Sequence, residues 1–308
     1  MAYRLRPEES IARGLRRVAK KELRSARNEL RKASPPRDEA IHEARKSIKK
    51  VRAVVELVEA DDGRGLGGCS RRLRNVNRTL SRLRDADAML GMLTKLRQQH
   101  PPVFDEHTFA RLRRRLSSHK HAAMEAAEDD GAWKRVDRAL RTLRQDARRW
   151  RPRHRRFGAL AAGVEVTYRR GRKALARAQK RQQADDFHEW RKHVKALWYQ
   201  LRLVEGCSSE IRKDARALHQ AETWLGDDHN LVVLCRELSK GTSLCDLERL
   251  RRAANRIQCE LRRKAIARTG RIYRAEPGVF LRRVKRAWRA WQRQTSSRDT
   301  KRRRHAAA

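Results

Sequence analysis

"FHEWRKHVKALWYQLRLVE", residues 187–205, repeats its apolar side chains with the period of an α-helix. At about 100° per residue, one face collects Trp190, Val194, Leu197, Leu201 and Val204. The opposite face collects cations together with an imidazole and a phenol, namely His188, Arg191, Lys192, Lys195, Tyr199 and Arg202. The stretch therefore predicts an amphipathic helix that buries one face in a bundle and presents a basic stripe on the other.

A second copy of this helix occurs early in the chain. "HEARKSIKKVRAVVELVE", residues 42–59, aligns without gaps on residues 188–205, and both copies begin with His-Glu and end with Leu-Val-Glu. Its stripe is His42, Arg45, Lys46 and Lys49, with Arg52 at the edge, opposite the apolar face Ala44, Ile48, Val51, Val55 and Val58. A second matching pair, "LSRLRDADAML" from Leu80 and "LGDDHNLVVL" from Leu225, follows the two copies. The duplication predicts two pseudosymmetric helical bundles, residues 1–150 and 155–294.

Helical periodicity extends over the rest of the chain, and strand signals are scarce. The segments are separated by short breakers: ASPPRD (33–38), DDGRGLGG (61–68), HPP (100–102), EDDG (128–131), RPRH (151–154), EGCSS (205–209), LGDD (225–228), KGTS (240–243) and EPG (276–278). The segments between them have the lengths of bundle helices, so we predict an all-α fold. Residues 295–308 are poor in apolar side chains and are predicted to be a basic disordered tail.

Charge narrows the choice of partner. The chain has 79 Lys and Arg against 37 Asp and Glu, a formal net charge of +42. Self-repulsion of this size favours a polyanionic partner: nucleic acid, an anionic membrane surface or a phosphate polymer. The cysteines form no CxxC pair, which suits a reducing compartment. The sequence shows neither a secretory signal nor an apolar run of about 18 residues, so we expect a cytoplasmic protein without membrane insertion.

The helices next to the two stripes also carry basic faces. The first is predicted to present Arg74, Arg78 and Arg82, and the second Arg212, Arg216 and His219. A charge run is most often a solvated helix face, but such faces normally mix signs. The stripe of residues 188–202 contains no carboxylate, and only Glu56 intrudes on the other. Because arginine forks suit bidentate contact with phosphate oxygens, we interpret the stripes as anion-binding faces.

Metal binding and catalysis find little support in the sequence. "HEWRKH" is similar to the zinc motif HExxH, but His193 lies one residue too far along and points away from His188. The segments "LRDAD" and "LGDDHN" suggest either Mg²⁺ carboxylates or a helix end, and we favour capping or ion pairing by Asp85, Asp227 and Asp228. The sequence holds no phosphate-binding glycine loop, paired-carboxylate signature or placed nucleophile. We therefore expect no metal, no cofactor and no enzymatic activity.

In the order and spacing of these segments, the chain resembles the CHAD family, the conserved histidine α-helical domain. The resemblance rests on residues 41–59, "LRDADAML", residues 187–205 and "LGDDHNLVVL", and it extends over about residues 3–291. It implies two helical bundles around a basic cleft, binding of inorganic polyphosphate, and a place on polyphosphate granules. The family's His and basic positions correspond to His42, Arg45, Lys49, Arg52, His188, Arg191 and Lys195. The sequence departs from the family at Trp198, often a basic residue, and at Asn230, usually Asp. The ExExK signature of the triphosphate-tunnel (CYTH) domain that often precedes it is absent, so the chain is similar to standalone members.

Two kinds of polyanion remain as readings of the cleft. Polyphosphate carries a charge on every phosphate and has no bases, so it needs cations and no stacking platform; the stripes contain few aromatic residues. Nucleic acid is the alternative, because non-specific contact with a phosphate backbone requires only charge. A nucleic-acid binder would be expected to show a helix-turn-helix, an RNA-recognition fold or aromatic residues between its cations, and none is evident. A phosphate-transferring enzyme is the third and weakest reading.

Overall fold

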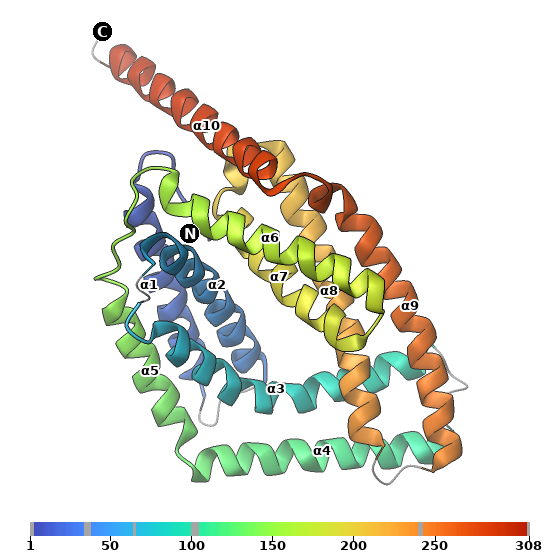
Figure 1. The fold of residues 1–308 in the computed structure, drawn as a ribbon. Coiled ribbons are helices and arrows are strands. Elements are labelled where there is room, and N and C mark those ends of the chain that lie inside the picture. The colour runs from blue at the N-terminus through green and yellow to red at the C-terminus, as the bar shows by residue number, and fades with distance from the viewer. Residues whose placement is uncertain (1–2, 34–37, 64–65, 100–104, 240–242, 307–308) are drawn as a thin grey trace.

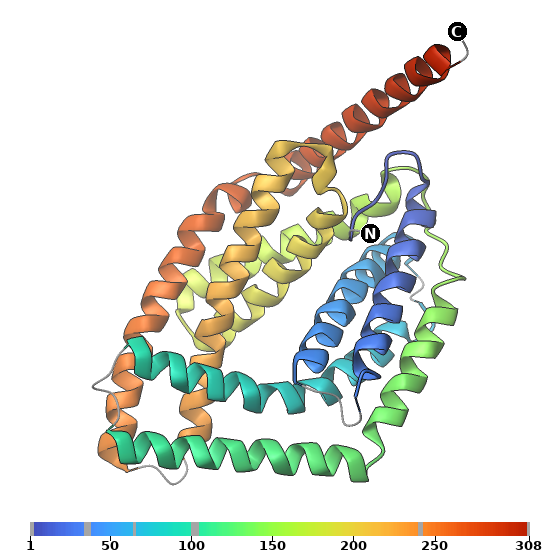
Figure 2. The ribbon, with the colours of Figure 1, turned by 180° about the vertical axis from the view of Figure 1, so that it is seen from behind.

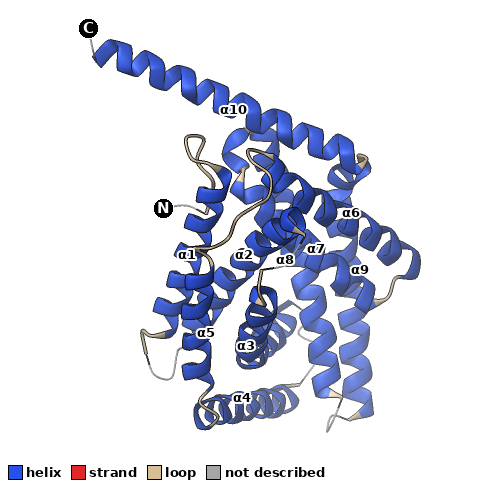
Figure 3. Ribbon diagram, turned by 60° about the vertical axis from the view of Figure 1, so that its left-hand side comes forward, coloured by secondary structure: helices blue, strands red, loops and turns tan. Residues whose placement is uncertain are grey.

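The computed structural model describes residues 3–33, 38–63, 66–99, 105–239 and 243–306, apart from the side chains of 82, 84–86, 99, 296 and 298–306. Within these ranges the chain is helical and Figure 3 shows no strand, which confirms the all-α prediction. The helices are α1 (Ile11–Leu30), α2 (Asp38–Asp62), α3 (Cys69–Gln99), α4 (Glu106–Asp129), α5 (Ala132–Asp146), α6 (Gly158–Arg181), α7 (Ala184–Leu203), the 3₁₀ turn η2 (Glu205–Cys207), α8 (Ser209–Leu238), α9 (Leu244–Arg274) and α10 (Pro277–Ala306).

Several helices begin at a side chain that caps their first turn. The Ser10 hydroxyl accepts from the Arg13 backbone N–H at the start of α1, and Asp105 accepts from Thr108 at the start of α4. Ser208 and Ser243 cap α8 and α9 in the same way. These residue types satisfy backbone N–H groups that have no partner inside the helix. The caps explain why the short polar breakers of the sequence separate long helices.

The break predicted at LGDD, residues 225–228, is wrong, because α8 runs through it from Ser209 to Leu238. Glycine inside a helix costs about 1 kcal/mol relative to alanine, but Gly226 makes room for a neighbour. A Cβ at this position would lie 3.0 Å from a guanidinium nitrogen of Arg191. Of the two roles predicted for Asp227 and Asp228, capping is wrong because both lie inside α8, and ion pairing is confirmed. Asp85 also lies inside a helix, α3, and its side chain is outside the described residues.

The main core joins residues from both predicted halves. Helices α1, α2 and α5 lie on one side of the molecule and α6 to α9 on the other, while α3 and α4 cross toward α8 and α9 (Figures 1 and 2). One continuous cluster of buried residues extends from Tyr3 to Trp288. The two halves come close together at Gly163 of α6, where a Cβ would lie 2.7 Å from the Leu57 Cα of α2. The two halves thus share a core, and their division at residues 150–155 stays a prediction.

A second core, which we call the tip core, forms where the α3–α4 hairpin meets the α8–α9 hairpin. It contains Met89, Met92, Leu93, Leu96, Leu112, Leu116, Leu231, Leu234, Leu238, Leu247, Leu250, Ala253 and Ala254. Helices α3 and α8 contribute to both cores, since the earlier residues of each, such as Leu73 and Leu218, belong to the main core. Each of these two helices therefore passes unbroken from one core to the other.

The disordered tail predicted for residues 295–308 is wrong as far as Ala306, because these residues continue α10. Figure 1 shows α10 projecting past the rest of the molecule. The physical reason is that helix propagation is easier than nucleation. Residues beyond Gly278 include neither Gly nor Pro and are rich in Arg and Ala, which favour helix. Phe280, Val284 and Trp288 anchor the start of α10 in the main core.

Candidate anion-binding cleft

The two repeated segments form α2 and α7, and each buries the apolar face predicted for it. Ala44, Ile48, Val51, Val55 and Val58 of α2 are at most 1% exposed, and Trp190, Val194, Leu197, Leu201 and Val204 of α7 or its end are at most 2% exposed. Burial of these faces turns both basic stripes away from the core. The helical period of the sequence is therefore sufficient to predict which side chains face outward from each helix.

The basic stripes line one cavity of about 1180 Å³ between α2, α3, α7 and α8, which we call the cleft. Thirteen predicted site residues lie on its wall: His42, Arg45, Lys46, Lys49, Arg52, His188, Arg191, Lys192, Lys195, Tyr199, Arg202, Arg216 and His219. Three others, Arg74 and Arg78 on α3 and Arg212 on α8, are exposed and not among the lining residues. Arg82 lies on α3 with its side chain outside the described residues.

The inner wall of the cleft holds a cluster of cations around Glu222 of α8. This carboxylate is buried, accepts a hydrogen bond from Lys195, and pairs with Arg191 at 3.2 Å. Burial acts to raise the pKa of Glu222, but the charges of Lys195 and Arg191 outweigh it, and the pKa is lowered. The second stripe contains no carboxylate of its own but is not without counter-charge, because Glu222 comes from another helix and Glu189, beside the stripe on α7, pairs with Lys192 at 2.7 Å.

Lys49 is a second lysine of this cluster whose amine is perturbed by its surroundings. Burial, together with the nearby charges of Lys195, Arg45 and Arg191, lowers the pKa of Lys49 to about 6. The pKa of Lys195 is also lowered, by burial first, although Glu222 opposes the change. An amine with a pKa of about 6, as at Lys49, is mostly neutral at pH 7. The cleft thus carries less positive charge at rest than its residue types suggest.

Histidines from two helices meet at one part of the wall. His188 of α7 stacks on His229 of α8, with ring centroids 3.9 Å apart and planes 30° apart. Burial lowers the pKa of both imidazoles, that of His229 to about 4, and each is also near the charges of Arg191 and Lys192. The Nδ1 atom of His188 is buried and has no hydrogen-bond partner among the described residues. Both rings are therefore neutral in the free protein at pH 7.

Aromatic rings line another part of the cleft. Trp198 stacks on His219 with centroids 4.1 Å apart and on Tyr199 with centroids 4.4 Å apart. The guanidinium of Arg202 lies 5.5 Å from the Trp198 ring centroid, a cation–π distance. Tyr199 lines the cleft but is only 2% exposed, and burial raises the pKa of its hydroxyl. The sequence predicts that Tyr199 presents its hydroxyl to the cleft, but in the structure its side chain mainly packs against its neighbours.

Sequence reasoning missed several cleft residues, and α8 contributes more of them than any other helix. The lining residues on this helix include Ala215, Glu222, Gly226, His229 and Asn230, which recur with helical spacing. The predicted break at residues 225–228 concealed this periodicity. From α3, the neutral side chains of Asn77 and Ser81 also line the cleft. Extending the helical period without a break from residue 209 to residue 238 would have placed these α8 residues on the same face as Arg216 and His219.

The histidine of the zinc-like motif has another role. His193 is partly buried, and its Nε2 lies 3.4 Å from Glu189, as expected of a histidine paired within its own helix. Among the described residues, no group of three His, Cys, Asp or Glu side chains could hold a metal ion. The helices within the described ranges also include none with both the length and the apolar character of a membrane span.

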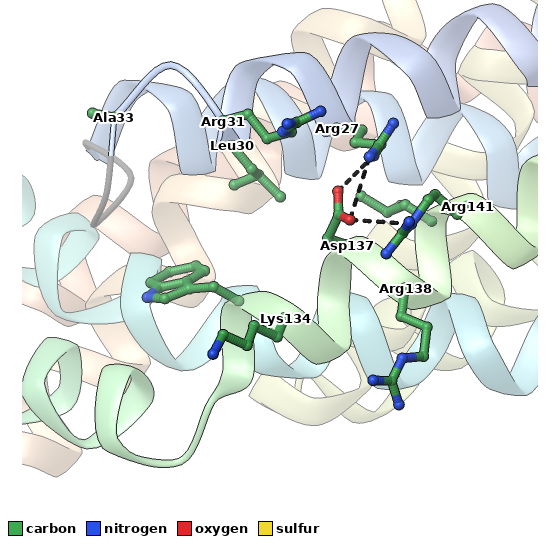
Figure 4. Close-up of a pocket in the computed structure, with 10 residues that line it drawn as sticks. Arg27, Leu30, Arg31, Ala33, Lys134, Asp137, Arg138 and Arg141 are labelled. Atoms are coloured by element: carbon green, nitrogen blue, oxygen red, sulfur yellow. Dashed lines mark hydrogen bonds and ion pairs between the residues drawn. The ribbon is translucent and has the colours of Figure 1, made fainter.

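A second basic cavity, the outer pocket, lies between α1 and α5 (Figure 4). Its volume is about 480 Å³, and it shares no lining residue with the cleft. Asp137 holds two of its arginines, with its oxygens 2.5 Å from Arg27 and 3.2 Å from Arg141. Arg31, Lys134 and Arg138 are exposed around it. The outer pocket thus has exposed Lys and Arg side chains, as the cleft has, but on a separate part of the molecule.

Comparison with known proteins agrees with this architecture. The CHAD domain family matches residues 66–239. A crystal structure of the CHAD domain from the plant Ricinus communis has a TM-score of 0.54 and 17% identity, covering 94% of this chain and 95% of that chain. PptA from Streptomyces chartreusis has a TM-score of 0.53 and 15% identity, covering 91% of this chain and 100% of that chain. At these identities the two structures show a shared fold. No curated protein matches the chain.

Proposed function

Since this chain belongs to the CHAD domain family, which is associated with polyphosphate binding, we propose that it binds inorganic polyphosphate non-enzymatically in the cleft. The observation that carries the proposal is the convergence of both repeated stripes on one cavity. Arg45 and Lys49 from α2 lie in the same cavity as Arg191 and Lys195 from α7. Side chains about 146 residues apart in the sequence would thus contact one ligand from two sides.

The charge of the cleft suits a polyanion. Its described lining contains nine Lys or Arg, namely Arg45, Lys46, Lys49, Arg52, Arg191, Lys192, Lys195, Arg202 and Arg216, against four carboxylates, Glu56, Glu205, Glu222 and Asp227. Polyphosphate presents one negative charge per phosphate along a linear chain, so several cations can be engaged at once. Arginine supplies forked donors and lysine a mobile point charge. Association should therefore be fast at low salt and weaken steeply as salt rises.

The aromatic residues of the cleft favour polyphosphate over nucleic acid. A single-stranded nucleic acid gains affinity when its bases stack on exposed aromatic rings. Trp198 already stacks on two rings of the protein itself, and Tyr199 is buried. The cleft therefore offers cations for phosphate groups but no free aromatic ring for bases, which favours a polymer that has phosphates and no bases.

The test compares charge reversal in the cleft with the same change in the outer pocket. The cleft variant combines Lys46→Glu, Lys192→Glu and Arg216→Glu, all exposed positions. The control combines Arg31→Glu, Lys134→Glu and Arg138→Glu, which alters net charge equally. For polyphosphate titrated at several salt concentrations, we expect the cleft variant to lose at least about 100-fold in affinity and to lower the salt slope by about two. Equal losses in both variants would contradict the cleft as the site.

Competition decides between the two polyanions. Long-chain polyphosphate and single- or double-stranded nucleic acid are offered together at physiological salt. We expect polyphosphate to displace nucleic acid, because the cleft offers cations for phosphates while its aromatic rings are already stacked or buried and give bases no platform. A nucleic acid that wins this competition, and loses it in the cleft variant, would replace polyphosphate as the ligand.

The cellular part of the proposal is that the protein sits on polyphosphate granules in the cytoplasm. A fluorescent fusion of the chain is expected to co-localise with granules, and the cleft variant is expected to be diffuse. The outer-pocket variant serves as the control and should remain on the granules. A cleft variant that stays on granules would separate localisation from binding in the cleft.

A further inference from the structure

Two amines approach each other in the inner wall of the cleft, where one carboxylate serves both. Lys49 of α2 and Lys195 of α7 both line this wall, and the charge of Lys195 acts on the Lys49 amine. Lys195 also donates to Glu222 of α8. Two ammonium groups near each other in a part-buried wall repel each other, and one carboxylate neutralises only one of them. Lys195, which donates to Glu222, is therefore the lysine that keeps its proton, and Lys49 is the neutral member.

The groups around Lys49 explain why it is the neutral member. The charged side chains that act on its amine are Arg45 from α2, Arg191 and Lys195 from α7, and Glu222 from α8. Helix α3 contributes the neutral lining residues Asn77 and Ser81. Helix α1 directs Glu22 to Ser47 and Lys50, and α6 packs on α2 through Gly163 against Leu57. Three cations and one carboxylate, already engaged by Lys195, thus surround the amine.

We propose that Lys49 couples polyphosphate binding to proton uptake, so that its amine is neutral in the free cleft and becomes an ammonium when a phosphate enters between α2 and α7. This inference rests on the proposed function. The proton comes from the buffer and no covalent bond changes. A phosphate oxygen near Lys49 supplies the negative charge that the free cleft lacks there, which favours the protonated amine.

Linkage sets the sign and size of the effect. A group that gains a proton on binding makes affinity fall as pH rises above the pKa of the free group. Because the pKa of free Lys49 is about 6, affinity should fall by up to about tenfold per pH unit above that value. His188, His219 and His229 of the cleft also have lowered pKa values and would add proton uptake of their own. A variant at Lys49 alone is needed to separate its contribution.

The experiment compares Lys49→Arg and Lys49→Met with the natural protein. Long-chain inorganic polyphosphate is titrated calorimetrically at pH 7.5 in two buffers of different ionisation enthalpy, which counts the protons taken up. Both variants are expected to take up about one proton fewer per bound chain. Lys49→Arg keeps its charge at every pH, so its affinity at pH 7.5 should exceed that of the natural protein by up to about 30-fold. Lys49→Met should bind more weakly than the natural protein at pH 6.

Lys134→Arg, in the outer pocket, is the control and should leave the proton count unchanged. Circular dichroism checks that each variant folds, and Lys49→Met carries the proton count if arginine does not fit. If the natural protein binds polyphosphate and the Lys49 variants take up as many protons as it does, the proposed role of Lys49 is wrong and the proposed function still stands. A natural protein that binds no polyphosphate overturns the proposed function itself.

Discussion

Replacing Glu222 by glutamine tests whether this carboxylate holds the free cleft together. The Glu222 side chain is 8% exposed, while its partners Lys195 and Arg191 are 19% and 21% exposed. Removing one partner of a buried ion pair costs about 3–5 kcal/mol, because the other charge stays buried. Both cations here retain some contact with water, and Lys195 can release its proton. We therefore expect Glu222→Gln to lower the free energy of unfolding by about 2–3 kcal/mol at pH 7.

Urea denaturation followed by circular dichroism measures this loss. Glu56→Gln is the matched control: Glu56 lines the same cleft, but its side chain is 38% exposed and lies 3.6 Å from Arg52. An exposed pair of this kind contributes no more than about 0.5 kcal/mol. The same Glu222→Gln substitution should strengthen polyphosphate binding, since phosphate no longer competes with a carboxylate for Lys195. A Glu222→Gln protein as stable as Glu56→Gln would refute the reasoning about the cation cluster.

Three further predictions concern packing, ion pairs and pH. Gly163→Ala should destabilise the protein by about 1–3 kcal/mol because its Cβ meets the backbone of α2, whereas Gly270→Ala, with no atom within 4 Å of its Cβ, should stabilise it by about 0.5–1 kcal/mol; thermal unfolding of both checks this. Asp228→Asn, at a 2%-exposed carboxylate, should cost about 3 kcal/mol in urea denaturation, and Asp227→Asn, at a 24%-exposed one, under about 1 kcal/mol. Because the pKa of His229 is lowered to about 4, the unfolded chain binds more protons than the folded protein between about pH 6.5 and 4, and the free energy of unfolding should decrease as the pH is lowered through this range. His229→Gln should flatten this part of a stability-versus-pH curve, and an unchanged slope would contradict the prediction.

The sequence predicts the cleft well where helical period alone decides which side chain faces outward. Residues 42–52 and 188–202 lie on the cleft wall because their apolar faces have only one way to be buried in a bundle. Arg74, Arg78 and Arg212 do not line it, although they share basic faces of their own helices. Asn77 and Ser81, at the same level of α3 as Arg78, line the cleft instead. Which face of a neighbouring helix meets the cleft thus depends on how that helix is rotated when it packs.

Contacts between helices account for what the sequence could not supply. Glu222 appears in the sequence as one acidic residue among many, and only the packing of α8 against α7 places it beside Lys195 and Arg191. Gly226 looks like a helix end until Arg191 is seen to occupy the space of its missing side chain. Local propensity favoured a break there, and tertiary packing outweighed that preference.

The passage of α3 and α8 through both cores determines how the cleft can respond to a ligand. Both helices contribute to its wall, and each is fixed at one end in the main core and at the other in the tip core. Neither contains a break that could act as a hinge. Widening or closing the cleft would require one of the two cores to repack, and packed cores resist gradual deformation. On the proposed function, a cleft held in this way would be a preorganised receptor, so that the entropy lost on binding falls on the flexible polymer.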